Sequence, residues 1–212
     1  MTIKNILKHK GIMIVLSSPS GAGKTSICKK ILKINTNIKM SISVTTRKQR
    51  NSELDGKDYY FYTQKKFLEE QKKGMFLESA KVFGNYYGTP KKFVEKNLLR
   101  GNDVIFDIDW QGAQKLSDYS KKDIVSFFIL PPTRKELKER LKKRNEDSSE
   151  IVKKRMNEAK SEISHWIEYD YVLINKNLDK CVNEILEIIK IEKKKRFRQN
   201  FLFDFIDDLL NS

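Results

Sequence analysis

The sequence contains few of the residues that build disulfide frameworks or metal clusters. Its 212 residues include two cysteines, Cys28 and Cys181, and two histidines, His9 and His165. The cysteines are too few and too far apart for a disulfide framework, and the histidines add no metal-ligand spacing. We therefore expect reduced thiols in a cytoplasmic protein.

Long apolar segments are also missing. The longest apolar runs, Ile12 to Leu16 and Val125 to Pro132, are far shorter than the roughly 20 residues needed to cross a bilayer. The N-terminal residues include no apolar stretch typical of a secretory signal peptide. The length suits one substantial core that carries insertions. We expect a globular protein without a membrane partner.

Positive charge, in contrast, is abundant. The chain has 43 lysines and arginines against 28 acidic residues, which gives a formal net charge of +15. Such a charge attracts nucleic acids, membrane headgroups and nucleotide phosphates alike. Much of the excess lies in helical stretches such as residues 190–196, where a solvated helix face explains it. We expect no specific nucleic-acid partner, only contacts that weaken with salt.

Continuous apolar segments alternate with helix-like segments along the chain. We predict strands at Ile12 to Ser18, Val104 to Ile108, Val125 to Leu130 and Tyr171 to Ile174, each followed by a turn and a helix. Such strands are typical of a parallel sheet covered on both faces. The predicted fold is α/β, with three α/β/α layers around a parallel core sheet.

Two segments depart from this pattern. Residues 39–89 contain short alternations, MSISVTTR and DYYFYT, which predict small antiparallel strands in an inserted lobe of mixed α/β structure. Residues 133–160 contain two highly charged helical segments around a polar break, as in a mobile surface hairpin. The core domain then comprises residues 1–38, 90–132 and 161–212.

The C-terminal segment, Phe201 to Leu210, is amphipathic. Its polar residues are acidic, which disfavours attachment to a membrane. We expect this segment to dock either onto the core or onto another subunit, which would make a homo-oligomer.

The segment SSPSGAGKTS, residues 17–26, follows the first predicted strand and leads into a predicted helix. It matches the phosphate-binding pattern G-x-x-x-x-G-K-[ST] except at Ser18, which replaces the first glycine. Gly21 and Gly23 let the backbone turn its N–H groups into a concavity, and the helix N-terminus adds partial positive charge. A polyphosphate is the expected ligand of this segment, which we call the phosphate loop (residues 18–25).

The loop predicts the contacts of a nucleoside triphosphate. Lys24 is expected on the β- and γ-phosphates, and the Thr25 hydroxyl on a Mg²⁺ ion that bridges them. Asn175, just past the last predicted strand, is either an adenine contact through its amide or a turn-forming asparagine. The predicted ATP-binding residues are Ser20, Gly21, Ala22, Gly23, Lys24, Thr25, Ser26 and Asn175.

The inserted lobe holds many side chains that suit a second phosphate. Arg47 and Arg50 lie three residues apart, and tyrosines recur nearby at Tyr59, Tyr60, Tyr62, Tyr86 and Tyr87. Guanidinium groups bind phosphate oxygens in pairs of hydrogen bonds, and tyrosine hydroxyls complete the shell without adding charge. Solvated arginines around a small aromatic core are the alternative interpretation.

Together these segments resemble the guanylate kinases of bacterial type, which phosphorylate GMP. The matching blocks follow the family's order from Ile12 to about Asn175, and they are SPSGAGKTS, SISVTTRKQRNSELDGKDYYF, FLESAKVFGNYYGTP, DVIFDIDWQGAQ, FFILPPT and KKRMNEAKSEISHWIEYDYVLIN. The resemblance implies a P-loop NTPase fold with a GMP-binding lobe and a helical lid at residues 133–160. It also implies the reaction of ATP and GMP to ADP and GDP, with dGMP as a possible second acceptor.

The resemblance assigns further residues. It implies that the GMP phosphate binds Arg47, Arg50, Tyr59 and Tyr87, and that guanine meets Ser43, Glu78, Thr89 and Asp109. Guanine offers N–H donors beside an O6 acceptor, which suits a carboxylate at Glu78 and a hydroxyl at Thr89. Adenine would leave that carboxylate facing an unprotonated nitrogen, at a cost of about 1 to 3 kcal/mol. Glu53 matches a family position that we expect to fix Arg47 or Arg50.

The implied chemistry needs no dedicated general base, because a phosphate monoester is already anionic near neutral pH. Catalysis is then positioning and charge neutralisation, to which lid arginines of the family contribute. The predicted catalytic residues are Lys24, Arg47, Arg140, Arg144 and Arg155. Asp107 and Asp109 end a core strand, and we favour Asp107 for Mg²⁺ and Asp109 for guanine, an assignment that the sequence leaves open.

Three other functions are compatible with parts of the sequence. Another nucleoside monophosphate kinase would share the phosphate loop. A base pocket for adenine or thymine, however, is not expected to contain a carboxylate such as that of Glu78. Scaffold domains similar to guanylate kinases have lost catalysis and bind phosphopeptides, whereas Lys24 and the lid arginines are present here. Nucleic-acid binding through net charge is the third.

Overall fold

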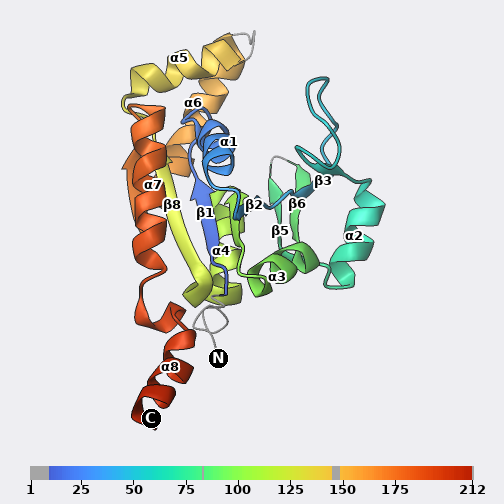
Figure 1. Ribbon diagram of the computed structural model, residues 1–212. Coiled ribbons are helices and arrows are strands. Elements are labelled where there is room, and N and C mark those ends of the chain that lie inside the picture. The colour runs from blue at the N-terminus through green and yellow to red at the C-terminus, as the bar shows by residue number, and fades with distance from the viewer. Residues whose placement is uncertain (1–9, 83, 145–148, 212) are drawn as a thin grey trace.

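The computed structural model describes residues 10–82, 84–144 and 149–211. It describes no side chains for residues 143–154. Figure 1 shows a central sheet with helices on both faces and a smaller sheet beside it. The strands are β1 (Met13–Ser17), β2 (Ile38–Met40), β3 (Val44–Thr45), β4 (Tyr60–Phe61), β5 (Phe76–Val82), β6 (Asn85–Pro90), β7 (Asp103–Asp107), β8 (Ile124–Leu130) and β9 (Tyr171–Ile174). The α-helices are α1 (Lys24–Ile34), α2 (Gln64–Lys72), α3 (Lys91–Leu99), α4 (Trp110–Ser120), α5 (Arg134–Arg144), α6 (Ser149–Ile163), α7 (Leu178–Glu192) and α8 (Phe201–Leu210).

The central sheet has the strand order β2-β7-β1-β8-β9, and all its pairings are parallel. The four predicted core strands are confirmed within two residues at each end. Strand β2 was not predicted, and it places Lys39 and Met40 in the core sheet instead of the inserted lobe. Three residues, one of them exposed, carry too little hydrophobic periodicity to reveal such an edge strand.

Two apolar clusters cover the two faces of this sheet. One cluster joins Ile14 and Leu16 of β1 to α1 and α7, through residues such as Ile31 and Ile185. The other joins Val15 of β1 and the strand β7 to α3 and α4. Because successive residues of a strand point to opposite faces, the continuous apolar run of β1 serves both clusters. This arrangement confirms the three-layer α/β fold.

The smaller sheet has the order β4-β3-β6-β5. Strands β3 and β5 pair with β6 in antiparallel fashion, as expected, but β3 and β4 are parallel, which corrects the prediction of antiparallel strands throughout. The chain between β3 and β4 is a long loop, which lets β4 run in the same direction as β3. Phe67 of α2 is fully buried and stacks on Phe76 and Tyr86, so the lobe has an aromatic core of its own.

Helices α5 and α6 pack on each other near the point where β1 leads into α1 (Figure 1). Leu137 and Leu141 of α5 meet Ala159 of α6 in a small apolar cluster. A Cβ atom at Gly21 would lie 3.1–3.2 Å from the side chains of Leu141 and Leu137, so α5 lies directly against the phosphate loop. Helix α6 continues to Ile163, three residues past the predicted end of the hairpin.

Helix α8 projects away from the central sheet at the end opposite α5 and α6 (Figure 1). Its large apolar side chains are exposed, among them Phe203, Ile206 and Leu210. The structure therefore does not place this segment on the core of its own chain, the first of the two expected alternatives. None of the described helices combines the length and the apolar composition that a bilayer crossing requires.

Candidate functional site

A cavity of about 820 Å³ opens at the carboxyl ends of β1 and β7 and extends to the smaller sheet. Open parallel sheets bind ligands at this edge. The cavity is lined from the phosphate loop by Ser18, Pro19, Ser20, Gly21, Gly23, Lys24 and Thr25, from α1 by Ser26, and from the far side by Ser43, Tyr59, Glu78, Tyr87 and Asp109. Residues predicted for two different substrates thus face one continuous space.

The phosphate loop has the backbone of an anion-binding turn. Gly21 and Gly23 have φ values of +92° and +102°, a conformation that side-chain-bearing residues rarely adopt. Helix α1 begins at Lys24, and no side chain caps its N-terminus at Gly23. The first N–H groups of the helix, which have no partner within the helix, are therefore directed to a ligand or to water.

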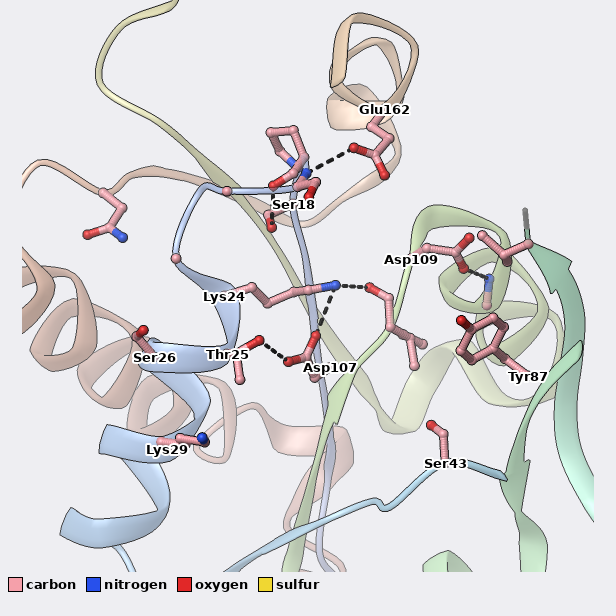
Figure 2. A pocket seen from close by; sticks show the side chains of 18 of the residues that line it. Ser18, Lys24, Thr25, Ser26, Lys29, Ser43, Tyr87, Asp107, Asp109 and Glu162 are labelled. Atoms are coloured by element: carbon pink, nitrogen blue, oxygen red, sulfur yellow. Dashed lines mark hydrogen bonds and ion pairs between the residues drawn. The ribbon is translucent and has the colours of Figure 1, made fainter. Parts of the chain in front are cut away.

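Lys24, Thr25 and Asp107 form a linked group at the base of the cavity (Figure 2). Lys24 Nζ lies 2.7 Å from the carbonyl oxygen of Ile108 and 3.0 Å from Asp107 Oδ1, and Thr25 Oγ1 donates to Asp107 Oδ2 at 3.0 Å. Burial acts to lower the pKa of Lys24, but the Asp107 carboxylate outweighs it and raises the pKa overall. The lysine is therefore a fixed positive charge beside the loop.

The same group suits a magnesium ion. The hydroxyl of Thr25 and the carboxylate of Asp107 are adjacent oxygen ligands, and Mg²⁺ in nucleotide sites typically takes one or two protein oxygens together with phosphates and water. Within the described residues there is no cluster of three or more histidine, cysteine or acidic side chains that would hold a metal by itself. A Mg²⁺ ion that arrives with a nucleotide fits this donor set.

Arg47 and Arg50 meet at Glu53. Arg47 Nη2 lies 2.7 Å from Glu53 Oε1, and the backbone N–H of Arg50 donates to Glu53 Oε2 at 2.9 Å. Burial acts to raise the pKa of Glu53, but these contacts lower it overall, so the carboxylate stays ionised. The guanidinium of Arg47 lies over the Tyr59 ring at 5.3 Å, and the Tyr59 and Tyr87 rings are 6.1 Å apart.

Glu78 and Thr89 form a buried pair at the other end of the cavity. Thr89 Oγ1 donates to Glu78 Oε1 at 2.7 Å, and both side chains are buried. Burial, assisted by nearby Asp109, raises the pKa of Glu78 to about 7. Thr89 therefore contacts Glu78 directly, and its contact with guanine O6 stays a prediction.

Asp107 and Asp109 face different parts of the cavity. Figure 2 shows Lys24 and Thr25 on one side, Tyr87 and Asp109 on the other, and Asp107 between them. Asp109 Oδ1 accepts from the N–H of Gly112 at 3.0 Å and so caps α4. A Cβ atom at Gly112 would lie 3.4 Å from both Asp109 Oδ1 and Glu78 Oε2, so these carboxylates flank the same glycine.

The remaining predicted residues belong to α5, to α6 and to the position after β9. Arg140 of α5 donates to the carbonyl oxygen of Ala22 at 3.3 Å, and Arg155 of α6 is half-buried. The side chain of Arg144 lies outside the described residues. The Asn175 amide donates to the Ala22 carbonyl at 2.9 Å, and its contact with adenine stays a prediction.

Comparisons with known proteins show the family of this chain. The sequence model of the guanylate kinase family matches residues 10–192. The chain belongs to the guanylate kinase family.

Individual guanylate kinases are similar over nearly the whole chain. The guanylate kinase of Paramagnetospirillum magneticum is 49% identical over 203 residues, which cover 96% of this chain and 95% of that protein. The guanylate kinase of Novosphingobium aromaticivorans is 48% identical over 96% of this chain and 92% of its own. The crystal structure of guanylate kinase from Anaplasma phagocytophilum has a TM-score of 0.81 at 38% identity, with 96% of this chain and 97% of that chain covered.

Among the residues of the cavity that were not predicted, Glu162 contacts the phosphate loop. Glu162, at the end of α6, lines the cavity, and its Oε2 accepts from the backbone N–H of Ser20 at 3.0 Å (Figure 2). Burial raises the pKa of Glu162, although this N–H and the charge of Lys24 oppose the shift. In the sequence, Glu162 is one acidic residue within a highly charged helical segment, so nothing distinguishes it there.

Proposed function

We propose that this member of the guanylate kinase family transfers the γ-phosphoryl group of ATP to GMP, with dGMP as a second acceptor. The products are ADP and GDP. The observation that carries the proposal is the single cavity shared by the phosphate loop and the Glu78 pocket. One end suits a polyphosphate and the other end suits a base with N–H donors, as in-line transfer between two nucleotides requires.

On the donor side, the phosphate loop and Ser26 of α1 bind the ATP phosphates. Its N–H groups and the charge of Lys24 neutralise the β- and γ-phosphates, while Thr25 and Asp107 hold Mg²⁺. When bound, the magnesium ion stabilises negative charge that develops on the phosphate oxygens. Lys24 exchanges its contacts with Asp107 and the Ile108 carbonyl for the phosphate oxygens when ATP binds.

On the acceptor side, Glu53 orients Arg47 and Arg50 toward the GMP phosphate, with the hydroxyls of Tyr59 and Tyr87. The Glu78 carboxylate accepts from the guanine N1–H and N2–H groups. We assign Asp109 and Ser43, which line the same end, to the edge of the base, and Thr89 to holding Glu78 in place.

The transfer step exchanges one P–O bond for another. A GMP phosphate oxygen forms a bond to the γ-phosphorus, and the bond from that phosphorus to the bridging oxygen of ADP breaks. GMP supplies an anionic oxygen near neutral pH, so no residue has to remove a proton. Lys24 and Arg47, with Arg140, Arg144 and Arg155 of the lid, neutralise the transferred group and exclude water.

We also infer that α8 packs on a second copy of this chain. The helix has three aspartates and no basic residue, whereas the whole chain carries a net charge of +15. Its exposed apolar side chains, Phe203, Phe205, Ile206, Leu209 and Leu210, would be covered in such a dimer. A second copy carries the same net charge of +15, so its basic residues outnumber its acidic ones and can pair with the aspartates. Cys28 and Cys181 are buried free thiols, which suits a reducing cytoplasm.

The reaction is tested by separating the nucleotides after incubation with ATP, Mg²⁺ and GMP. Equal amounts of ADP and GDP are expected, and neither should form without GMP. Release of ADP without GDP would show hydrolysis of ATP instead of transfer and would contradict the proposal.

A further inference from the structure

Asn175 is held rigidly at the end of the central sheet. Its backbone N–H donates to the carbonyl oxygen of Leu130 at 2.8 Å, which extends the pairing of β8 and β9 by one residue. The residue is 5% exposed. Its side-chain amide therefore projects from a fixed backbone, and Nδ2 donates to the carbonyl oxygen of Ala22 in the phosphate loop at 2.9 Å.

Arg140 of α5 supplies a second donor to the same carbonyl. Its Nη1 lies 3.3 Å from the Ala22 oxygen, and its Nη2 donates to the Asn175 carbonyl at 3.2 Å. Glu136, one turn earlier on α5, holds the guanidinium at 2.9 Å. Two side chains from separate elements thus converge on one carbonyl group of the loop.

This contact fixes the orientation of a peptide group. In a planar trans peptide the carbonyl and the following N–H point in opposite directions. With the Ala22 carbonyl turned toward Asn175, the Gly23 N–H is turned away from it. Gly23 has φ +102°, and a Cβ atom there would lie 2.5 Å from Asn175 Nδ2, so glycine is required both by the backbone and by the close approach of the amide.

We propose that Asn175 is a positioning residue of the phosphate loop: its amide, together with Arg140, holds the Ala22 carbonyl outward so that the Gly23 N–H faces a nucleotide phosphate. The inference rests on the proposed function, because it takes the phosphates of ATP as the ligand of the loop. It differs from an adenine contact, since Asn175 acts on the protein backbone and through it on phosphate.

Two variants separate this role from an adenine contact. Asn175→Asp keeps the shape but turns the donor into an acceptor that repels the Ala22 carbonyl, and Asn175→Leu keeps the size without a donor. Each should weaken ATP binding by about tenfold, the effect of losing one hydrogen bond to a charged group. Inorganic tripolyphosphate, which has no base, should lose affinity by the same factor. The KM for ATP should rise while the affinity for GMP stays unchanged.

Asn177→Asp is the matched control. Asn177 caps α7 by accepting from the N–H groups of Asp179 and Lys180, and aspartate keeps that role, so this variant should bind ATP and tripolyphosphate like the wild type.

A loss of ATP affinity with unchanged tripolyphosphate affinity would show an adenine contact and overturn the inference. Equal losses for ATP and GMP would show a general role in the fold and would also overturn it. The proposed reaction fails in a different way: the wild-type protein would then form no GDP, whereas the positioning role is measured by binding alone.

Discussion

Thr89 donates its hydroxyl hydrogen to Glu78 across 2.7 Å, within a pocket that buries both side chains. The pair therefore presents an oriented carboxylate to the cavity. Burial of Glu78 disfavours its ionised form, which is the form that accepts hydrogen bonds from guanine. A bound guanine would supply two N–H donors and relieve that penalty, whereas adenine would add an unprotonated nitrogen to it.

The raised pKa of Glu78 predicts a pH dependence of GMP binding. With a pKa of about 7, the free protein holds a mostly protonated Glu78 below pH 7 and a mostly ionised one above it. Only the ionised carboxylate accepts both guanine donors, so the KM for GMP should fall as the pH rises through 7.

The GMP phosphate also titrates, with a pKa of about 6. Glu78→Gln is the control, because it keeps the phosphate ionisation and removes that of the side chain. The KM of the wild type for GMP should show an additional change near pH 7 that the KM of Glu78→Gln lacks. Identical pH profiles would show that Glu78 does not bind guanine.

Lys24→Ala should reduce turnover at least about a hundredfold, the scale of losing one charge-stabilising donor in a transition state. The cause is the loss of the fixed positive charge beside Asp107. Circular dichroism should show an unchanged fold. Lys33→Ala, an exposed lysine on the same helix, is the matched control and should retain activity. Near-normal turnover by Lys24→Ala would rule out the phosphate loop as the donor site.

Glu162→Gln should tighten ATP binding roughly threefold or more, because apparent affinity scales with the fraction of protein whose site is free. The carboxylate now accepts from the Ser20 N–H within the anion-binding loop, and an incoming phosphate has to displace it. Glu158→Gln, one turn earlier on α6, is the control and should have little effect. Calorimetric titration of ATP measures both. Weaker binding by Glu162→Gln would instead assign the carboxylate to holding the loop.

Helix α8 predicts a dimer that depends on its apolar face. Light scattering should give the mass of two 25.0 kDa chains for the wild type. Leu209→Asp should yield monomers, because it places a charge among the exposed apolar side chains. Asp207→Asn, which removes one of the three acidic charges and adds none among the apolar side chains, should weaken the dimer far less than Leu209→Asp. A monomeric wild type at all accessible concentrations would refute the α8 contact.

The sequence predicted those parts of the molecule in which a local pattern determines the structure. Strand β1 is a continuous apolar run up to Ser17 because a parallel sheet covered on both faces buries every residue of this central strand. The phosphate loop was predictable because its glycines adopt backbone conformations that few other residues can. Strand β2 and the parallel pairing of β4 were not predicted, since strands of two or three residues depend on their neighbours.

The unpredicted parts of the site depend on contacts between distant segments. Asn175 meets Ala22, and Glu162 meets Ser20, across more than a hundred residues of sequence. Glu78 of β5 and Thr89 of β6 meet across the smaller sheet, and only the folded geometry shows that contact. Residue type and spacing indicate which groups gather at the site, but not which of them act on one another.

The most direct test of the central claim is the rate of ADP formation from ATP and Mg²⁺ with GMP, AMP, CMP, UMP or dTMP as separate acceptors. The account predicts rapid turnover with GMP and little with the other bases, because only guanine presents two N–H donors to Glu78 in this arrangement. Comparable rates with AMP would contradict the assignment of the Glu78 pocket to guanine.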